Sequence, residues 1–210
     1  MPELAALFGI VAALAVGTVS PGPSFVMVAR TAVSASRAEG LAAALGMGVG
    51  GVVFAVLALL GLQGVLLAVP SLYLVLKVAG GLYLAYLGWR IWSAAAQPLV
   101  ISSDTQADAP ASARRAFTLG LTTQVSNPKT AIVYASVFAA FMPPVHTLSF
   151  SLGVAACVFT IEAAWYAVVA TALSSTGPRN AYLRYKSWID RAAGGVMMAL
   201  GLKLVASART

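Results

Sequence analysis

Long apolar runs separated by short polar connections make up most of this chain. Each run is long enough to cross a bilayer as a helix, and the period-two alternation of a membrane barrel strand does not occur in them. The pattern therefore predicts an all-α integral membrane protein with six transmembrane helices. The six apolar runs are Leu4–Ala29, Gly40–Leu62, Leu72–Trp92, Ala116–Met142, Leu148–Leu173 and Trp188–Ala206.

Two of these runs are interrupted by a capping residue followed by proline. Asn127-Pro128 lies in the middle of the fourth run, and Ser20-Pro21-Gly22-Pro23 lies in the first. Asn and Ser are favoured helix N-caps, and proline is favoured at the first helical position. We therefore predict that helices one and four are broken at Pro21 and Pro128, and that each continues as a second half-helix. The alternative is that the prolines are simple kinks.

An internal repeat relates the two halves of the chain. Ser20-Pro21 and Asn127-Pro128 are 107 positions apart, and Leu45-Gly46 and Leu152-Gly153 have the same spacing. Since each half contains three helices, the second half must insert upside down, and inverted repeats place a substrate at their interface near the midplane. We predict one transmembrane domain over residues 1–210, with repeat 1 at about 4–92, a linker at 93–114 and repeat 2 at about 115–206.

The charged residues are few and predict an orientation. The chain is 60% hydrophobic and 9% charged, with a net charge of +7; soluble domains contain roughly 25% charged residues. Most of the basic residues lie in or beside connections, so we interpret them as topology signals and lipid contacts, with no nucleic-acid site. They predict cytoplasmic first, third and fifth connections and both termini outside. Nine flank these connections: Arg30, Arg37, Arg90, Arg114, Arg115, Arg179, Arg184, Lys186 and Arg191.

The residues needed for redox, metal or nucleophilic chemistry are scarce. Cys157 is the only cysteine and His146 the only histidine, which excludes a disulfide within the chain and a thiolate metal cluster. We expect no cofactor, no metal site and no enzymatic activity. Two alternatives remain: a cation or metal efflux protein of similar helical plan, and an intramembrane enzyme with a serine–lysine dyad that uses Lys129.

The polar residues at the two breaks predict a site for a carboxylate at mid-membrane depth. A helix N-terminus offers unpaired N–H groups and a partial positive charge, and Lys129 adds a full charge. Glu162, midway along the fifth run, could bind an ammonium group, carry a coupling proton or pair with Lys129. The polar residues could instead be local caps, and the two aromatic residues could simply pack. The candidate substrate contacts are Ser20, Pro21, Gly22, Pro23, Gln124, Ser126, Asn127, Pro128, Lys129, Trp165 and Tyr166.

Five short motifs occur in order along nearly the whole chain. They are Ser20-Pro21-Gly22-Pro23, Leu76-Lys77-x-x-Gly80-x-x-Tyr83-Leu84-x-Tyr86-Leu87-Gly88, Asn127-Pro128-Lys129, Trp165-Tyr166 and Gly201-Leu202-Lys203-Leu204. Together they resemble the lysine-exporter-type (LysE/RhtB) amino-acid translocators, and most of all their homoserine/threonine-efflux branch. The resemblance implies a secondary-active exporter of amino acids or close derivatives in the bacterial inner membrane, with H⁺ antiport as the energy source. It leaves the substrate and any homo-oligomer open.

Overall fold

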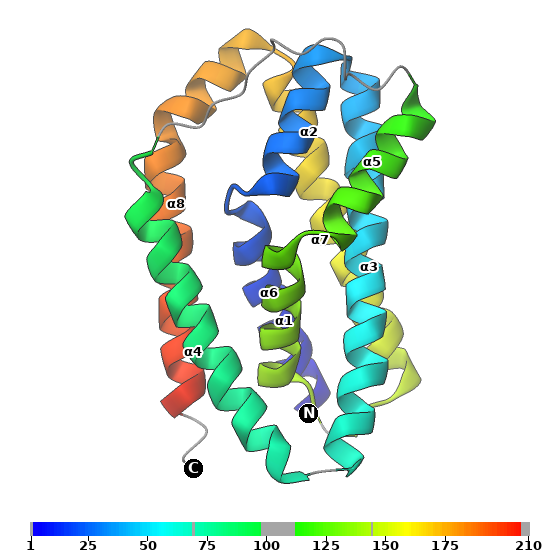
Figure 1. Cartoon of the computed structure of the whole chain (residues 1–210), viewed down its shortest axis with the longest axis vertical. Helices are drawn as coiled ribbons and strands as arrows, with labels where there is room; N and C mark the ends of the chain where they lie inside the picture. Colours follow the sequence, from blue (N-terminus) through cyan, green and yellow to red (C-terminus); the bar gives the residue numbers. More distant parts are fainter. Residues whose placement is uncertain (1, 69, 98–111, 144, 207–210) are drawn as a thin grey trace.

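The computed structural model describes residues 2–68, 70–97, 112–143 and 145–206, and within them the chain is helical without a strand (Figure 1). This confirms the predicted all-α class. Most of the predicted linker, residues 98–111, lies outside the described residues. The helices are α1 (Pro2–Val19), α2 (Pro23–Ser34), α3 (Arg37–Ala68), α4 (Pro70–Ala94), α5 (Ala113–Val125), α6 (Pro128–Phe141), α7 (Leu148–Leu173) and α8 (Thr176–Ala206).

The gaps between the apolar runs predict connections at residues 63–71 and 174–186, and both are longer than the connections in the structure. Residues 63–68 continue α3 and residue 70 already begins α4, because no proline precedes Pro70 in this stretch, and proline is itself favoured at a helix start. The predicted connection at 174–186 is helical from Thr176 onward. Its early turns have an apolar face of their own, since Tyr182 stacks on Phe25 of α2 with ring centroids 5.1 Å apart.

The helix starts at the two interruptions differ from each other. α6 begins at Pro128, and the Asn127 side chain caps it by accepting from the Lys129 N–H at 3.0 Å. α2, in contrast, begins at Pro23 with Gly22 at the N-cap, so the second helix starts two residues later than the predicted Pro21. Pro23 restricts the residue before it to an extended conformation, and Gly22 adopts one.

Length and apolar composition support two or three membrane spans. Residues Arg37–Gly61 of α3 and Leu148–Leu173 of α7 are each long and apolar enough to cross a membrane. α1 and α2 pass the same test together, with a bend of 56° between them. Large apolar side chains also cover much of the outer surface, among them Phe8, Leu60 and Leu152, as expected for a surface in contact with lipid.

The helices run alternately up and down the bundle (Figure 1). α1 and α2 rise, α3 descends, α4 rises, α5 and α6 descend, α7 rises and α8 descends. The first turn of α1 and the last turn of α8 therefore lie at the same end of the bundle. α3 packs on α5 and α7, and α4 packs on α8 and α6.

Glycines set the closest helix contacts. A Cβ on Gly88 of α4 would collide with the Gly194 carbonyl oxygen of α8, and a Cβ on Gly194 would meet the Gly88 carbonyl oxygen in return. About two turns away along both helices, a Cβ on Gly201 would collide with the Gly81 carbonyl oxygen. α4 and α8 thus cross in antiparallel directions with their backbones in contact, which only glycine permits.

Candidate functional site

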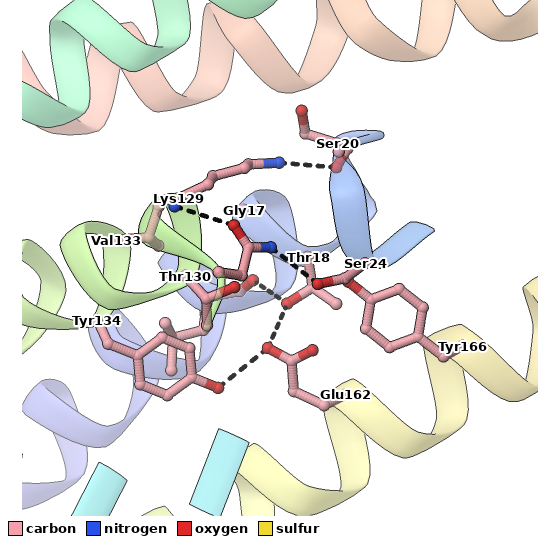
Figure 2. Close-up of a pocket in the computed structure, with 13 residues that line it drawn as sticks. Gly17, Thr18, Ser20, Ser24, Lys129, Thr130, Val133, Tyr134, Glu162 and Tyr166 are labelled. Carbon is pink, nitrogen blue, oxygen red and sulfur yellow. Dashed lines mark hydrogen bonds between the residues drawn. The ribbon is translucent and has the colours of Figure 1, made fainter. Parts of the chain in front are cut away.

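The two helix junctions, at residues 20–22 and 126–127, meet in the middle of the bundle (Figure 2). Asn127 joins them, because its side-chain oxygen caps α6 while its Nδ2 donates to the Ser24 hydroxyl at 2.8 Å. Ser24 lies in the first turn of α2 and is 2% exposed. The first turn of α2 is therefore held directly against the first turn of α6.

Gln124 extends this connection into the last turn of α5. The Ser24 hydroxyl donates to the Gln124 side-chain oxygen at 2.8 Å, and the Thr130 hydroxyl donates to the same oxygen at 3.5 Å. Gln124 is buried, so an unmatched amide oxygen there would be costly. The result is a buried polar network in which α2, α5 and α6 each contribute a hydrogen-bonding side chain.

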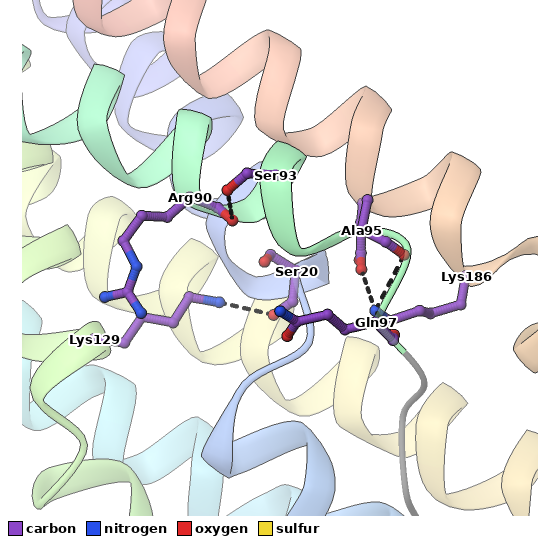
Figure 3. A network of polar contacts seen from close by, with 8 residues as sticks. Ser20, Arg90, Ser93, Ala95, Gln97, Lys129 and Lys186 are labelled. Carbon is purple, nitrogen blue, oxygen red and sulfur yellow. Dashed lines mark hydrogen bonds and ion pairs between the residues drawn. The ribbon is translucent and has the colours of Figure 1, made fainter.

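Lys129 spans the gap between the two junctions. Its ammonium nitrogen donates to the backbone carbonyl oxygen of Ser20 at 2.8 Å (Figures 2 and 3). Gly22 leaves room for this path, since a Cβ there would lie 3.3 Å from the lysine Cδ and 3.5 Å from Nζ. The Ser20 hydroxyl is itself buried and has no hydrogen-bond partner among the described residues.

Glu162 approaches the same region from α7. Its Oε1 accepts from the Tyr134 hydroxyl at 3.0 Å and lies 3.2 Å from the Thr18 hydroxyl, whose single proton also faces the Leu14 carbonyl oxygen at 2.8 Å. Its Oε2 is buried without a partner in the described part of the chain. The predicted alternative of a direct ion pair with Lys129 is not the arrangement seen, because the lysine contacts the Ser20 carbonyl.

These groups border a small cavity. It is lined by both junctions together with Tyr134, Glu162 and Tyr166, and its free space of about 20 Å³ accommodates roughly one water molecule. An amino acid does not fit there in this conformation. Any ligand that reached Glu162 would require the surrounding helices to separate.

A larger, open groove lies on the other side of Lys129, with free space of about 530 Å³. Ser20, Gly22 and Lys129 border both the cavity and the groove. The outer wall of the groove comes from α4 and α8, and a buried ion pair lies in it. Lys186 contacts Asp190 Oδ2 at 2.9 Å. It also donates to the Gln97 carbonyl oxygen at 2.8 Å (Figure 3).

The predicted substrate contacts lie in three kinds of place: in the groove, in the cavity, or away from both. Residues 21–23 and Pro128 line the groove, and Tyr166 lines the cavity. Ser126 is exposed at the end of α5. Trp165 packs against a hydrophobic cluster around Phe25 and does not line the cavity.

Several residues that line these spaces are not predicted from the sequence. Thr130 and Tyr134 lie one turn apart on α6, directly after Lys129 in the sequence, and their i, i+4 spacing is the signal that could have found them. The positions of Arg90 and Lys186 beside connections indicate only topology signals, and no sequence pattern singles out Asp190. A group of three or more His, Cys, Asp or Glu residues suited to a metal ion does not occur in the described ranges.

Comparison with known proteins gives one consistent family. The family model "LysE type translocator" matches residues 15–208. The threonine efflux protein of Escherichia coli (strain K12) is 34% identical over 91% of this chain and 93% of its own length. That of Salmonella typhi is 35% identical over the same shares. A leucine efflux protein of Klebsiella pneumoniae is 34% identical, but over 58% of this chain and 56% of its own.

No solved structure matches the chain. The match nevertheless extends over almost every residue that builds the junctions, the cavity and the groove. It confirms the resemblance drawn from the five motifs, and it agrees with the expectation of a transporter that is not an enzyme. The chain belongs to the LysE-type translocator family.

Proposed function

We propose that this protein is a secondary-active exporter of small amino acids across the bacterial inner membrane, with threonine as the first substrate to test. The observation that carries the proposal is the contact of Lys129 with the Ser20 carbonyl oxygen. A carbonyl dipole does not neutralise an ammonium charge, so the lysine remains able to pair with a carboxylate. The threonine efflux proteins, similar over 91% of the chain, support the choice of substrate.

The proposed membrane arrangement has six spans in two inverted repeats, with α1–α2 and α5–α6 each forming one broken span. The glycine contacts between α4 and α8 support it. Gly81 and Gly88 of α4 correspond to Gly194 and Gly201 of α8, because each pair is 113 positions apart (194 − 81 and 201 − 88). A two-fold axis that exchanges the repeats would therefore turn the contact of Gly81 with Gly201 into the contact of Gly194 with Gly88. Both contacts are present. With the first, third and fifth connections in the cytoplasm, both termini lie outside.

In the proposed mechanism, the substrate carboxylate replaces the Ser20 carbonyl as the partner of Lys129 and is stabilised by the partial positive charge at the N-terminus of α6. Glu162 then binds the substrate ammonium through Oε2 or carries the coupling proton, because that oxygen has no partner among the described residues. The cavity must widen for this step. Rocking of one repeat against the other would open it alternately to the two sides.

Flux measurements with purified protein in liposomes test this function. When a pH gradient is imposed, radiolabelled threonine should accumulate in the more acidic compartment, because substrate and protons move in opposite directions. A sodium gradient should have no effect on this flux. Threonine amide, which lacks the carboxylate, should compete at least tenfold more weakly than threonine, since a charge-assisted hydrogen bond is worth about 1.5 kcal/mol or more. Equal competition by the amide would contradict a carboxylate site. Absence of flux for every amino acid tested would contradict export.

A further inference from the structure

The groove beyond Lys129 contains a carboxylate that is only half satisfied. Asp190 is 3% exposed and lines the groove, and its Oδ2 is held by Lys186 at 2.9 Å. Its Oδ1 is buried and has no hydrogen-bond partner among the described residues. A charged oxygen removed from water without a donor costs free energy, so a donor from outside the chain would be bound favourably there.

Lys186 cannot supply that donor. An ammonium group has three N–H bonds, and Lys186 already faces three acceptors: Asp190 Oδ2, the Gln97 carbonyl oxygen at 2.8 Å and the Ala95 carbonyl oxygen at 3.4 Å (Figure 3). Two of these acceptors lie beyond the last full turn of α4, where a helix leaves carbonyl groups unpaired. Lys186 therefore fixes the end of α4 and the position of Asp190.

Two further cations border the same groove. Arg90 of α4 is exposed and lines the outer part, and Lys129 lines the inner part beside Ser20. The groove thus offers one unsatisfied anionic oxygen and two cations. Its free space of about 530 Å³ is within the range of small-molecule sites. A small zwitterion, with an ammonium and a carboxylate on the same carbon, matches this pattern of charge.

We propose that the groove is a loading site for the amino acid, separate from the cavity at Glu162. A small rotation of the Asp190 side chain exposes Oδ1 to the groove, where it accepts hydrogen bonds from the substrate ammonium, and Arg90 pairs with the substrate carboxylate. The substrate then passes inward by transferring its carboxylate to Lys129, which borders both spaces. This proposal rests on the proposed export function and adds to it a first binding step, on the side of the bundle where α4 ends and α8 begins.

Binding of three related probes to the purified, detergent-solubilised full chain tests the assignment. Threonine carries both charged groups, threoninol lacks the carboxylate, and 2,3-dihydroxybutyrate lacks the ammonium. Asp190→Asn should weaken threonine and threoninol about tenfold and leave 2,3-dihydroxybutyrate unchanged. Arg90→Gln should weaken threonine and 2,3-dihydroxybutyrate and leave threoninol unchanged.

This crossed pattern separates recognition from a structural role, which would change all three affinities together. Asparagine still offers an acceptor to Lys186, and Asp190→Glu should restore part of the affinity for threonine. Arg90 is exposed, so its variant tests the proposal even where the Asp190 variant is unstable. Glu39→Gln is the matched control, because it removes a carboxylate at the same end of the bundle but outside the groove.

The failure of this proposal is distinguishable from the failure of the export function. A wild-type protein that exports threonine, combined with Asp190→Asn and Arg90→Gln variants that bind all three probes normally, would overturn the loading site alone. Weakening of all three probes by the same factor in either variant would overturn it as well. A wild-type protein without threonine flux or binding would overturn both proposals.

Discussion

Lys129 and Ser20, 109 positions apart in the chain, are joined by a hydrogen bond of 2.8 Å from the lysine ammonium to the serine carbonyl oxygen. Both residues border the small cavity and the open groove, so this bond lies at the boundary between the two spaces. Its acceptor is neutral. The interaction is therefore weaker than an ion pair, and a substrate carboxylate can compete with it.

Replacement of Lys129 tests its role most directly. Lys129→Met keeps the length and apolar stem of the side chain but removes the charge, and we expect it to abolish threonine binding and export in proteoliposomes. Lys129→Arg should transport poorly, because a planar guanidinium does not fit the space of a compact ammonium beside Gly22. Lys203→Met, on an exposed position of α8, is the control. Normal export by Lys129→Met would contradict a carboxylate site at this residue.

Glu162 should separate coupling from exchange. Glu162→Gln retains an oxygen that can accept from Tyr134 but cannot exchange a proton. We expect loss of export driven by a pH gradient, while exchange of internal for external threonine without a gradient continues. Flux with and without the gradient measures both. Export that still follows the pH gradient in this variant would assign Glu162 a structural role.

The link between Asn127 and Ser24 should stabilise the junctions. Asn127→Ser keeps a residue that caps helices well, but the serine side chain is too short to reach Ser24. It should lower the free energy of unfolding by roughly 1 kcal/mol, the usual contribution of one buried hydrogen bond. Ser24→Ala breaks the same link. The double variant should therefore be less destabilised than the sum of the two, as measured by thermal unfolding in detergent. Simple additivity would mean that the two side chains do not interact.

The contact between α3 and α5 should tolerate no added side chain. A Cβ on Gly120 would collide with the Ala43 backbone, and one on Gly46 would collide with the Phe117 backbone. Gly120→Ala and Gly46→Ala should each destabilise the protein by about 1–3 kcal/mol through overpacking. Gly153→Ala is the matched control, because nothing lies within 4 Å of its added Cβ. Higher helix propensity should make that control neutral or slightly stabilising.

The proposed orientation predicts which positions react with an impermeant thiol reagent. On a Cys157→Ser background, which should retain export because Cys157 has no thiol partner in the chain, Val145→Cys should label from outside intact cells. Ser36→Cys and Ser175→Cys should label only after the membrane is opened. All three positions are exposed and lie in or next to connections. Labelling of Ser36→Cys in intact cells would invert the assignment.

The sequence alone is enough for local features that depend on neighbouring residues. α7 begins and ends where its apolar run does, because Thr147 supplies the N-cap and the polar residues after Leu173 end the run. The start of α6 at Pro128 follows from the capping preference of Asn127. The all-α class follows from the length of the apolar runs, since their backbone groups must be satisfied internally in lipid.

Only the tertiary structure decides which distant residues meet. The hydrogen bonds from Asn127 to Ser24 and from Tyr134 to Glu162 depend on how separate helices cross. The burial of Lys186 and Asp190 likewise cannot be predicted from the sequence. In sequence they form an i, i+4 pair of the kind common on exposed helices. Their burial arises because α8 continues to Thr176 and packs on the end of α4, a contact between elements about 90 residues apart that no local pattern specifies.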